Sequence, residues 1–245
     1  MARSDELMSQ KGKRTLLIAV ISVMAALHII LSIPPGPVGF RRLSIIMEPL
    51  EGIIGGPLVG FAIGAVGAAG GRFARPETFY IDNFFGLAEA VGALGAGLLI
   101  TRKGWIVTAI YGGMLVSFLL HPFAREVPLW TLWDTYLGFL ATFPATVMLR
   151  KFNVKNATSK SLLPVVALVT FIALELDAMT RIFMLADLGL YEFYGLPFSA
   201  WSTIFIAGAF QTPVEAAYSV IVTSIIGVPV LMALKAARII DWPLT

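Results

Sequence analysis

Four ionisable side chains interrupt two long apolar stretches near the end of the chain. Glu175, Asp177 and Arg181 lie together in one stretch, and Glu215 lies in the next. If these stretches cross a membrane, an unpaired charge at that depth is costly, so each of the four is a candidate functional residue by default. Asp177 and Arg181 stand four positions apart and can pair on one helix face, whereas Glu175 points about 160° away from Asp177.

Two interpretations of this charged group remain open. In the first, Asp177 and Arg181 neutralise each other and only stabilise a helix bundle. In the second, Glu175 and Glu215, which have no cation nearby in the sequence, face a polar cavity and bind a small substrate with cationic or hydrogen-bond-donor groups. The candidate substrate-binding residues are Glu175, Asp177, Arg181, Glu215, Trp201, Gln211 and Tyr218.

Aromatic residues gather ahead of the last apolar stretch. The segment 187–201 contains Tyr191, Phe193, Tyr194, Phe198 and Trp201. Such rings are typical of the membrane interface. They also fit the wall of a pocket for a flat, ring-containing ligand, which the connection 187–210 and the loop 34–42 would cover from the outer side.

The chain lacks the motifs of common enzymes. It has no cysteine and two histidines, so thiol chemistry is excluded and a metal centre has few ligands. We expect His28, in the first apolar stretch, to be a hydrogen-bonded packing residue. No HExxH, GxSxG or GxxxxGK(S/T) sequence occurs, so the signatures of zinc peptidases, serine hydrolases and P-loop ATPases are missing. We expect neither an enzyme nor a resident cofactor, and ATP-driven transport would need a separate ATPase.

The elements that must position these residues are apolar along the whole chain. Of 245 residues, 58% are hydrophobic and 13% are charged, and the mean hydropathy is +0.84. A soluble domain carries about 25% charged residues, so the composition excludes a soluble globular protein. It predicts an all-α polytopic membrane protein with a single integral membrane domain over 1–245. The formal charge of +3 gives no sign of a basic surface for nucleic acid.

The cations predict how the helices cross the membrane. The apolar stretch 43–71 contains Gly55-Gly56-Pro57, a natural break between helices. One continuous crossing there would place seven cations inside and ten outside, whereas a hairpin places twelve inside and five outside, as the positive-inside rule requires. The inside set is Arg3, Lys11, Lys13, Arg14, Arg102, Lys103, Arg150, Lys151, Lys155, Lys160, Lys235 and Arg238, and the outside set is Arg41, Arg42, Arg72, Arg75 and Arg125.

The hairpin leads to a specific topology. We expect a bundle of about eight transmembrane helices in the cell membrane, with a cytoplasmic segment 1–14 and both termini in the cytoplasm. Small residues recur at helical spacing, as at Gly60 and Gly64, and let helices approach closely in lipid. They indicate either packing inside one bundle or a docking face for another membrane subunit.

Segment 40–71, FRRLSIIMEPLEGIIGGPLVGFAIGAVGAAGG, resembles the first loop, short second helix and third helix of the substrate-binding S components of energy-coupling factor (ECF) transporters. The family's G-P-L-x-G-x-x-x-G pattern is matched here in full. The matching residues are Gly56, Pro57, Leu58, Gly60 and Gly64. Segment 213–238 is similar to the family's last helix with its basic cytoplasmic exit, and the resemblance covers about half of the chain.

The resemblance implies a function and a set of partners. It implies a membrane subunit that captures a vitamin-like small molecule and works with a transmembrane coupling subunit and ABC ATPases. Small residues of the first helix form the family's docking face, for which Ser22, Ala25 and Ala26 are the candidates here.

The chain has two more expected helices than the six of this family. Either 105–151 is an inserted helical pair between the first half of the core, 15–104, and the last two core helices, 160–238, or the core spans 15–151 and the last two helices are an appendage. We favour the insertion, because the terminal helix matches better.

Two other functions remain open: a proton-coupled secondary transporter, and a structural subunit of a larger membrane complex. Inverted repeats would favour the transporter, and none is evident.

Overall fold

Helices make up nearly all of the described chain. The computed structural model describes residues 2–39, 41–76, 85–152 and 156–237, and no strand forms within these ranges, so the all-α prediction is confirmed. The α-helices are α1 (Ala2–Leu31), α2 (Met47–Phe73), α4 (Gly86–Ile100), α5 (Gly104–Leu120), α6 (Trp133–Lys151), α7 (Ser159–Ala186), α8 (Leu190–Tyr194) and α9 (Phe198–Ala237). Three short 3-10 helices join them, η1 (Leu43–Ile46), η4 (Pro122–Arg125) and η5 (Leu129–Leu132).

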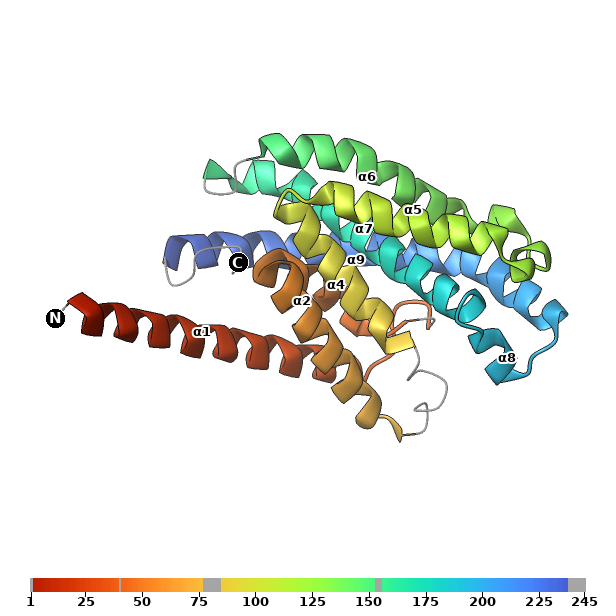
Figure 1. The fold of residues 1–245 in the computed structure, drawn as a ribbon, viewed down its shortest axis with the longest axis horizontal. Coiled ribbons are helices and arrows are strands. Elements are labelled where there is room, and N and C mark those ends of the chain that lie inside the picture. The colour runs from red at the N-terminus through yellow and green to blue at the C-terminus, as the bar shows by residue number, and fades with distance from the viewer. Residues whose placement is uncertain (1, 40, 77–84, 153–155, 238–245) are drawn as a thin grey trace.

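Helix α7 lies in the middle of the bundle (Figure 1). It packs against α4, α5, α6 and α9, while α2 packs against the other side of α4 and α1 packs against α2 at the edge of the bundle. The pair α5–α6 lies across α7 from α1. Apolar side chains of α7 such as Val169 and Ile172 are fully buried in the core.

Three helical runs of the described chain are long and apolar enough to cross a membrane by length and composition. They are Leu43–Phe73, Ser159–Ala186 and Phe198–Ala236. Leu17–Leu31, Gly86–Ile100 and Gly104–Leu120 are shorter apolar helices. This is the composition of membrane-associated helices, and the number that cross the membrane stays a prediction.

The predicted break at Gly55-Gly56-Pro57 is confirmed. Gly56 has φ 74° and ψ −175° inside α2, a conformation essentially restricted to glycine. The chain reverses there, since a Cβ on Gly60 would lie 2.6 Å from Gly52 Cα, whereas eight residues of straight helix span about 12 Å.

The first half of the hairpin is shorter than a full membrane span. Residues 47–55 extend for about 14 Å, and with η1 added end to end for about 22 Å. The hydrocarbon core of a bilayer is about 30 Å thick. Eight full-length crossings therefore do not fit this element, and the first half enters the bundle and turns back.

The small residues of the second half pack inside the bundle. A Cβ on Gly67 would lie 2.5 Å from Cγ of His28 on α1, and a Cβ on Gly64 would lie 3.1 Å from Cα of Ala90 on α4. Of the two interpretations of the small-residue pattern, packing within one bundle is confirmed for these glycines.

The cation-rich links lie at one end of the bundle. Arg102, between α4 and α5, donates to the carbonyl of Phe152 after α6 at 2.9 Å, and Lys235 of α9 donates to the carbonyl of Ala157 before α7 at 2.7 Å. The N-terminus lies at this same end, and the link between α5 and α6 lies at the other (Figure 1). Successive long segments therefore alternate in direction, as the predicted topology requires.

The segment expected to cover the outer side is largely helical. Helix α9 is continuous from Phe198 to Ala237, so 198–210 forms its first turns, and the connection is limited to 187–197 with α8. The expectation of a loop over 187–210 is wrong because polar side chains interrupt the hydropathy there without ending the helix. The Thr203 hydroxyl, for example, donates back to the Ser199 carbonyl at 3.0 Å.

The three small residues expected to dock a partner do not share one face of α1. Ala25 is buried against the bundle, whereas Ser22 and Ala26 are exposed, together with Ile18 and Ile30. An external docking face on α1 would therefore consist of Ser22 and Ala26 with these apolar neighbours, and Ala25 contributes to internal packing.

Candidate functional site

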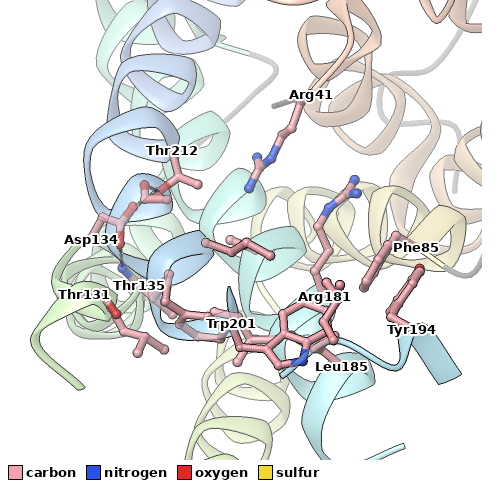
Figure 2. Close-up of a pocket in the computed structure, with 17 residues that line it drawn as sticks. Arg41, Phe85, Thr131, Asp134, Thr135, Arg181, Leu185, Tyr194, Trp201 and Thr212 are labelled. Atoms are coloured by element: carbon pink, nitrogen blue, oxygen red, sulfur yellow. Dashed lines mark hydrogen bonds between the residues drawn. The ribbon is translucent and has the colours of Figure 1, made fainter. Parts of the chain in front are cut away.

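A cavity of about 390 Å³ opens between α6, α7 and the first turns of α9 (Figure 2). Its volume is that of a small-molecule site. Most of its lining is apolar, and the polar groups form two clusters. The residues that line it are Arg41, Phe85, Thr131, Leu132, Asp134, Thr135, Ala178, Arg181, Ile182, Leu185, Tyr194, Leu196, Trp201, Ile204, Phe205, Gly208 and Thr212.

Two guanidinium groups form the first polar cluster. Arg41, from the loop before η1, and Arg181, from α7, both line the cavity (Figure 2). Asp177 lies one turn before Arg181, whose Nε is 3.0 Å from each Asp177 carboxylate oxygen. Nη1 of Arg41 lies 3.3 Å from the same carboxylate. The predicted pairing of Asp177 with Arg181 is confirmed, and Asp177 also pairs with Arg41.

Glu215 of α9 fixes the position of Arg41 from the other side. The backbone N–H of Arg41 donates to Oε1 of Glu215 at 2.8 Å, and Nε of Arg41 lies 3.7 Å from Oε2. Burial alone would lower the pKa of the Arg41 guanidinium, but Asp177 and Glu215 outweigh it and raise the pKa above its ordinary value. Arg41 is therefore a permanent cation at the cavity.

Hydroxyl groups of α9 attach the loop that carries Arg41. Ser219 donates to the carbonyl of Ile45 at 2.9 Å and Thr223 donates to the carbonyl of Ile46 at 3.1 Å. These two carbonyls belong to η1, the short helix that follows Arg41 in the chain. The loop is thus held against α9 over several turns.

A second charged network lies behind Arg181 and is centred on Glu89 of α4. Its Oε2 is 2.9 Å from Nε2 of His28, and its Oε1 is 3.0 Å from Nη2 of Arg72 and 3.5 Å from Nη2 of Arg181. Nδ1 of His28 lies 2.6 Å from Glu51. His28 is hydrogen-bonded, as expected, and Glu89 joins α1, α2, α4 and α7 through His28, Arg72 and Arg181.

Hydroxyl and carboxylate groups form the second polar cluster, across the cavity from Arg181 (Figure 2). Asp134 accepts from the backbone N–H of Thr135 at 2.9 Å and from the hydroxyl of Thr212. Thr131 lies on the same side and donates to the Pro128 carbonyl. A carboxylate with two oxygens accepts about four hydrogen bonds, so Asp134 retains acceptor capacity.

Aromatic rings form much of the remaining wall. Phe85 stacks on Tyr194 with 6.2 Å between ring centroids and 8° between planes. Tyr194 in turn contacts Trp201 edge-on, with centroids 5.9 Å apart. These rings come from the start of α4, from α8 and from α9, so the cavity depends on the association of all three.

The sequence-predicted site residues divide into three groups. Arg181 and Trp201 line the cavity, and Asp177 and Glu215 lie behind its wall, where they pair with Arg41. The other three are placed elsewhere. Glu175 packs beside Gly138 of α6, Tyr218 packs against the small cluster of Ile45, Leu174 and Ala216, and Gln211 does not line the cavity.

Sequence reasoning missed three acidic or basic residues of this region. Asp134 lies within the apolar stretch 129–149 and Glu89 within 82–101, so the argument from charge at membrane depth applied to both. Arg41 has the acidic residues Glu48 and Glu51 nearby in the sequence. It pairs instead with Glu215, 174 positions away, and no local spacing indicates such a contact.

The described residues contain no group of three or more His, Asp or Glu side chains that could hold a metal ion. Their charged groups are arranged as ion pairs across helices. Comparison of the chain with protein-family models, with curated proteins and with solved structures finds no match in any of the three.

Proposed function

We propose that this protein is a membrane-embedded subunit that binds a vitamin-like small molecule for uptake, and that it works with a coupling subunit and ABC ATPases. The observation that carries the proposal is the cavity between α6, α7 and α9, in which two arginines and an aromatic wall meet inside a bundle of apolar helices. Such a combination of apolar wall and few polar anchors is typical of small-molecule sites.

The place of the cavity in the bundle supports uptake. Its residues come from the start of α6, the end of α7 and the start of α9, at the end of the bundle opposite the N-terminus (Figure 1). With the termini in the cytoplasm, this end faces outward, where a substrate would enter. The chain has no P-loop sequence, so an ATP-driven process requires a partner.

A proton-coupled secondary transporter is the second candidate, and one observation favours it. Both carboxylate oxygens of Glu48 and one of Glu175 are buried with no hydrogen-bond partner among the described residues. Buried carboxyl groups of this kind occur in proton relays of transporters. A purely structural subunit is less well supported, because Asp177, Arg181 and Glu215 pair within the chain instead of presenting charge to a neighbour.

The orientation can be tested with single cysteines, because the chain has none of its own. Lys103→Cys, in the exposed link between α4 and α5, should resist a membrane-impermeant thiol reagent in intact cells and react after lysis. Arg125→Cys, in the exposed link between α5 and α6, should react in intact cells. Labelling of Lys103→Cys from outside would contradict the orientation.

Partner association can be tested on the exposed face of α1. Ala26→Trp should abolish co-purification of nucleotide-binding ATPases with the tagged protein, because a large ring on a small-residue surface blocks close helix approach. Binding of small molecules should remain. Val116→Trp, at an exposed position of α5, is the control and should keep both properties. Loss of both properties, or of neither, in Ala26→Trp counts against a docking face there.

The energy source separates the two candidate functions. Uptake of the small molecule that co-purifies with the protein, identified by mass spectrometry, should stop when cellular ATP is depleted and continue when a protonophore collapses the proton gradient. Uptake that stops with the protonophore at constant ATP would instead support the secondary transporter, and Glu48→Gln should then abolish it.

A further inference from the structure

We propose that the cavity binds a singly charged carboxylate with a flat apolar body and a hydrogen-bond donor at its far end. The inference rests on the proposed function, which it narrows to a class of substrate. It reverses the expectation from the sequence, which assigned a cationic substrate to the acidic residues, because the charged groups at the cavity differ from those that the sequence singles out.

The accessible charge beside the arginines is positive. The side chain of Arg181 is 25% exposed, whereas that of Asp177 is 0% exposed. Arg41 and Arg181 line the cavity, and the carboxylates of Asp177 and Glu215 lie behind them. On this side of the cavity, a ligand therefore meets the guanidinium groups before it can reach Asp177 or Glu215.

Both arginines retain donors for a ligand. Arg181 uses Nε toward Asp177 and Nη2 toward Glu89, and Arg41 uses Nε and Nη1 toward Glu215 and Asp177. Among the described residues no hydrogen bond or ion pair involves Nη1 of Arg181 or Nη2 of Arg41. Both guanidinium groups line the cavity and pair with the same Asp177 carboxylate, so one ligand carboxylate beside them could accept from both. Hydrogen bonds from a guanidinium to a carboxylate are charge-assisted and among the stronger ones in proteins.

The surrounding acids favour one negative charge over two. Asp177, Glu215 and Glu89 already lie within 3.7 Å of the two guanidinium groups. A phosphate dianion would add a second charge close to these three carboxylates, and like charges at short range repel strongly where water is scarce. A monocarboxylate therefore fits better than a phosphate ester.

The other walls define the rest of the ligand. The stacked pair of Phe85 and Tyr194, with Trp201 edge-on to it, favours a flat apolar body. Asp134 lies across the cavity from Arg181, and it retains acceptor capacity beside Thr131. An acceptor there favours a hydroxyl or N–H donor at the end of the ligand away from its carboxylate.

Four probes test this assignment by isothermal titration calorimetry on the purified protein in lipid nanodiscs. They are para-hydroxyphenylpropanoate, its primary amide, tyramine, and phenylpropanoate without the hydroxyl. We expect the hydroxylated carboxylate to bind at least about tenfold more tightly than the amide or tyramine, since a charge-assisted hydrogen bond is lost in each. Phenylpropanoate should bind several-fold more weakly than its hydroxylated partner.

A matched pair of variants tests the role of Arg181. Arg181→Gln should remove the preference for carboxylate over amide, and Arg125→Gln, at an exposed position away from the cavity, should keep it. The wild-type series alone remains decisive if Arg181→Gln fails to fold. Tighter or equal binding of tyramine or the amide overturns the inference, and so does binding of none of the four probes. Neither result decides the proposed function, which is judged by partner association and by the energy source of uptake.

Discussion

Gly52→Ala should strongly destabilise the folded protein. A Cβ at this position would overlap the backbone carbonyl oxygen of Ala93 and would lie 2.7 Å from the backbone nitrogen of Gly97. Both neighbours are backbone atoms of α4, so no side chain can rotate away and the two helices must separate. Overpacking costs about 1–3 kcal/mol in ordinary cores, and occasionally more. We expect the upper end here, because Gly52 lies between the reversal at Gly56 and the most extensive helix contact of the bundle.

The measurement is the yield of monodisperse protein in mild detergent, followed by thermal unfolding of that fraction. Gly113→Ala is the matched control. It lies in α5, a Cβ there would meet nothing within 4 Å, and alanine in place of glycine in a helix is favourable by about 0.5–1 kcal/mol. An unfolding temperature for Gly52→Ala equal to that of the wild type would contradict the close contact between α2 and α4.

Glu89→Gln should also cost a large share of the stability. Glutamine keeps the shape of the side chain but removes the charge that His28, Arg72 and Arg181 share. Removal of one partner from a buried ion pair costs about 3–5 kcal/mol, because the remaining charge is left without compensation. Here two guanidinium groups would lose a carboxylate partner together, so we expect the upper part of that range.

Glu126→Gln is the control for this change. Glu126 lies at an exposed position in the link between α5 and α6, so its neutralisation should leave stability almost unchanged. The free energy of unfolding should be compared for both variants in the same detergent. A Glu89→Gln protein as stable as Glu126→Gln would show that the network contributes no net stabilisation.

The features that sequence could predict are those set by neighbours along the chain. The reversal at Gly56 follows from a local Gly-Gly-Pro sequence, and the Asp177–Arg181 pair follows from helical spacing. Both are confirmed. The composition likewise indicates the all-α class, because apolar residues so greatly outnumber charged ones.

The candidate site could be predicted only in part, because distant segments build it. Arg41 reaches Glu215 across 174 positions, and His28 reaches Glu89 across 61. Neither distance corresponds to a helical period. Of the acidic residues that the sequence placed in the site, Asp177 and Glu215 lie behind its wall and pair with Arg41, whereas Glu175 packs beside Gly138. Their position in apolar stretches singled these residues out, but it did not indicate which of them reach the cavity.

The short first half of the hairpin imposes an order on biogenesis. A nine-residue helix with a reversed backbone at Gly56 cannot remain alone in lipid, because the peptide groups at the turn would lack partners there. In the finished protein α4 covers this turn, since a Cβ on Gly97 would be in contact with the backbone of Gly56 and Pro57. The ribosome releases α4 after the hairpin, so the apolar run Leu43–Phe73 has to wait in the translocon or insert first as one straight span. We therefore expect the reversal to form late in synthesis, when α4 arrives and converts one long segment into two.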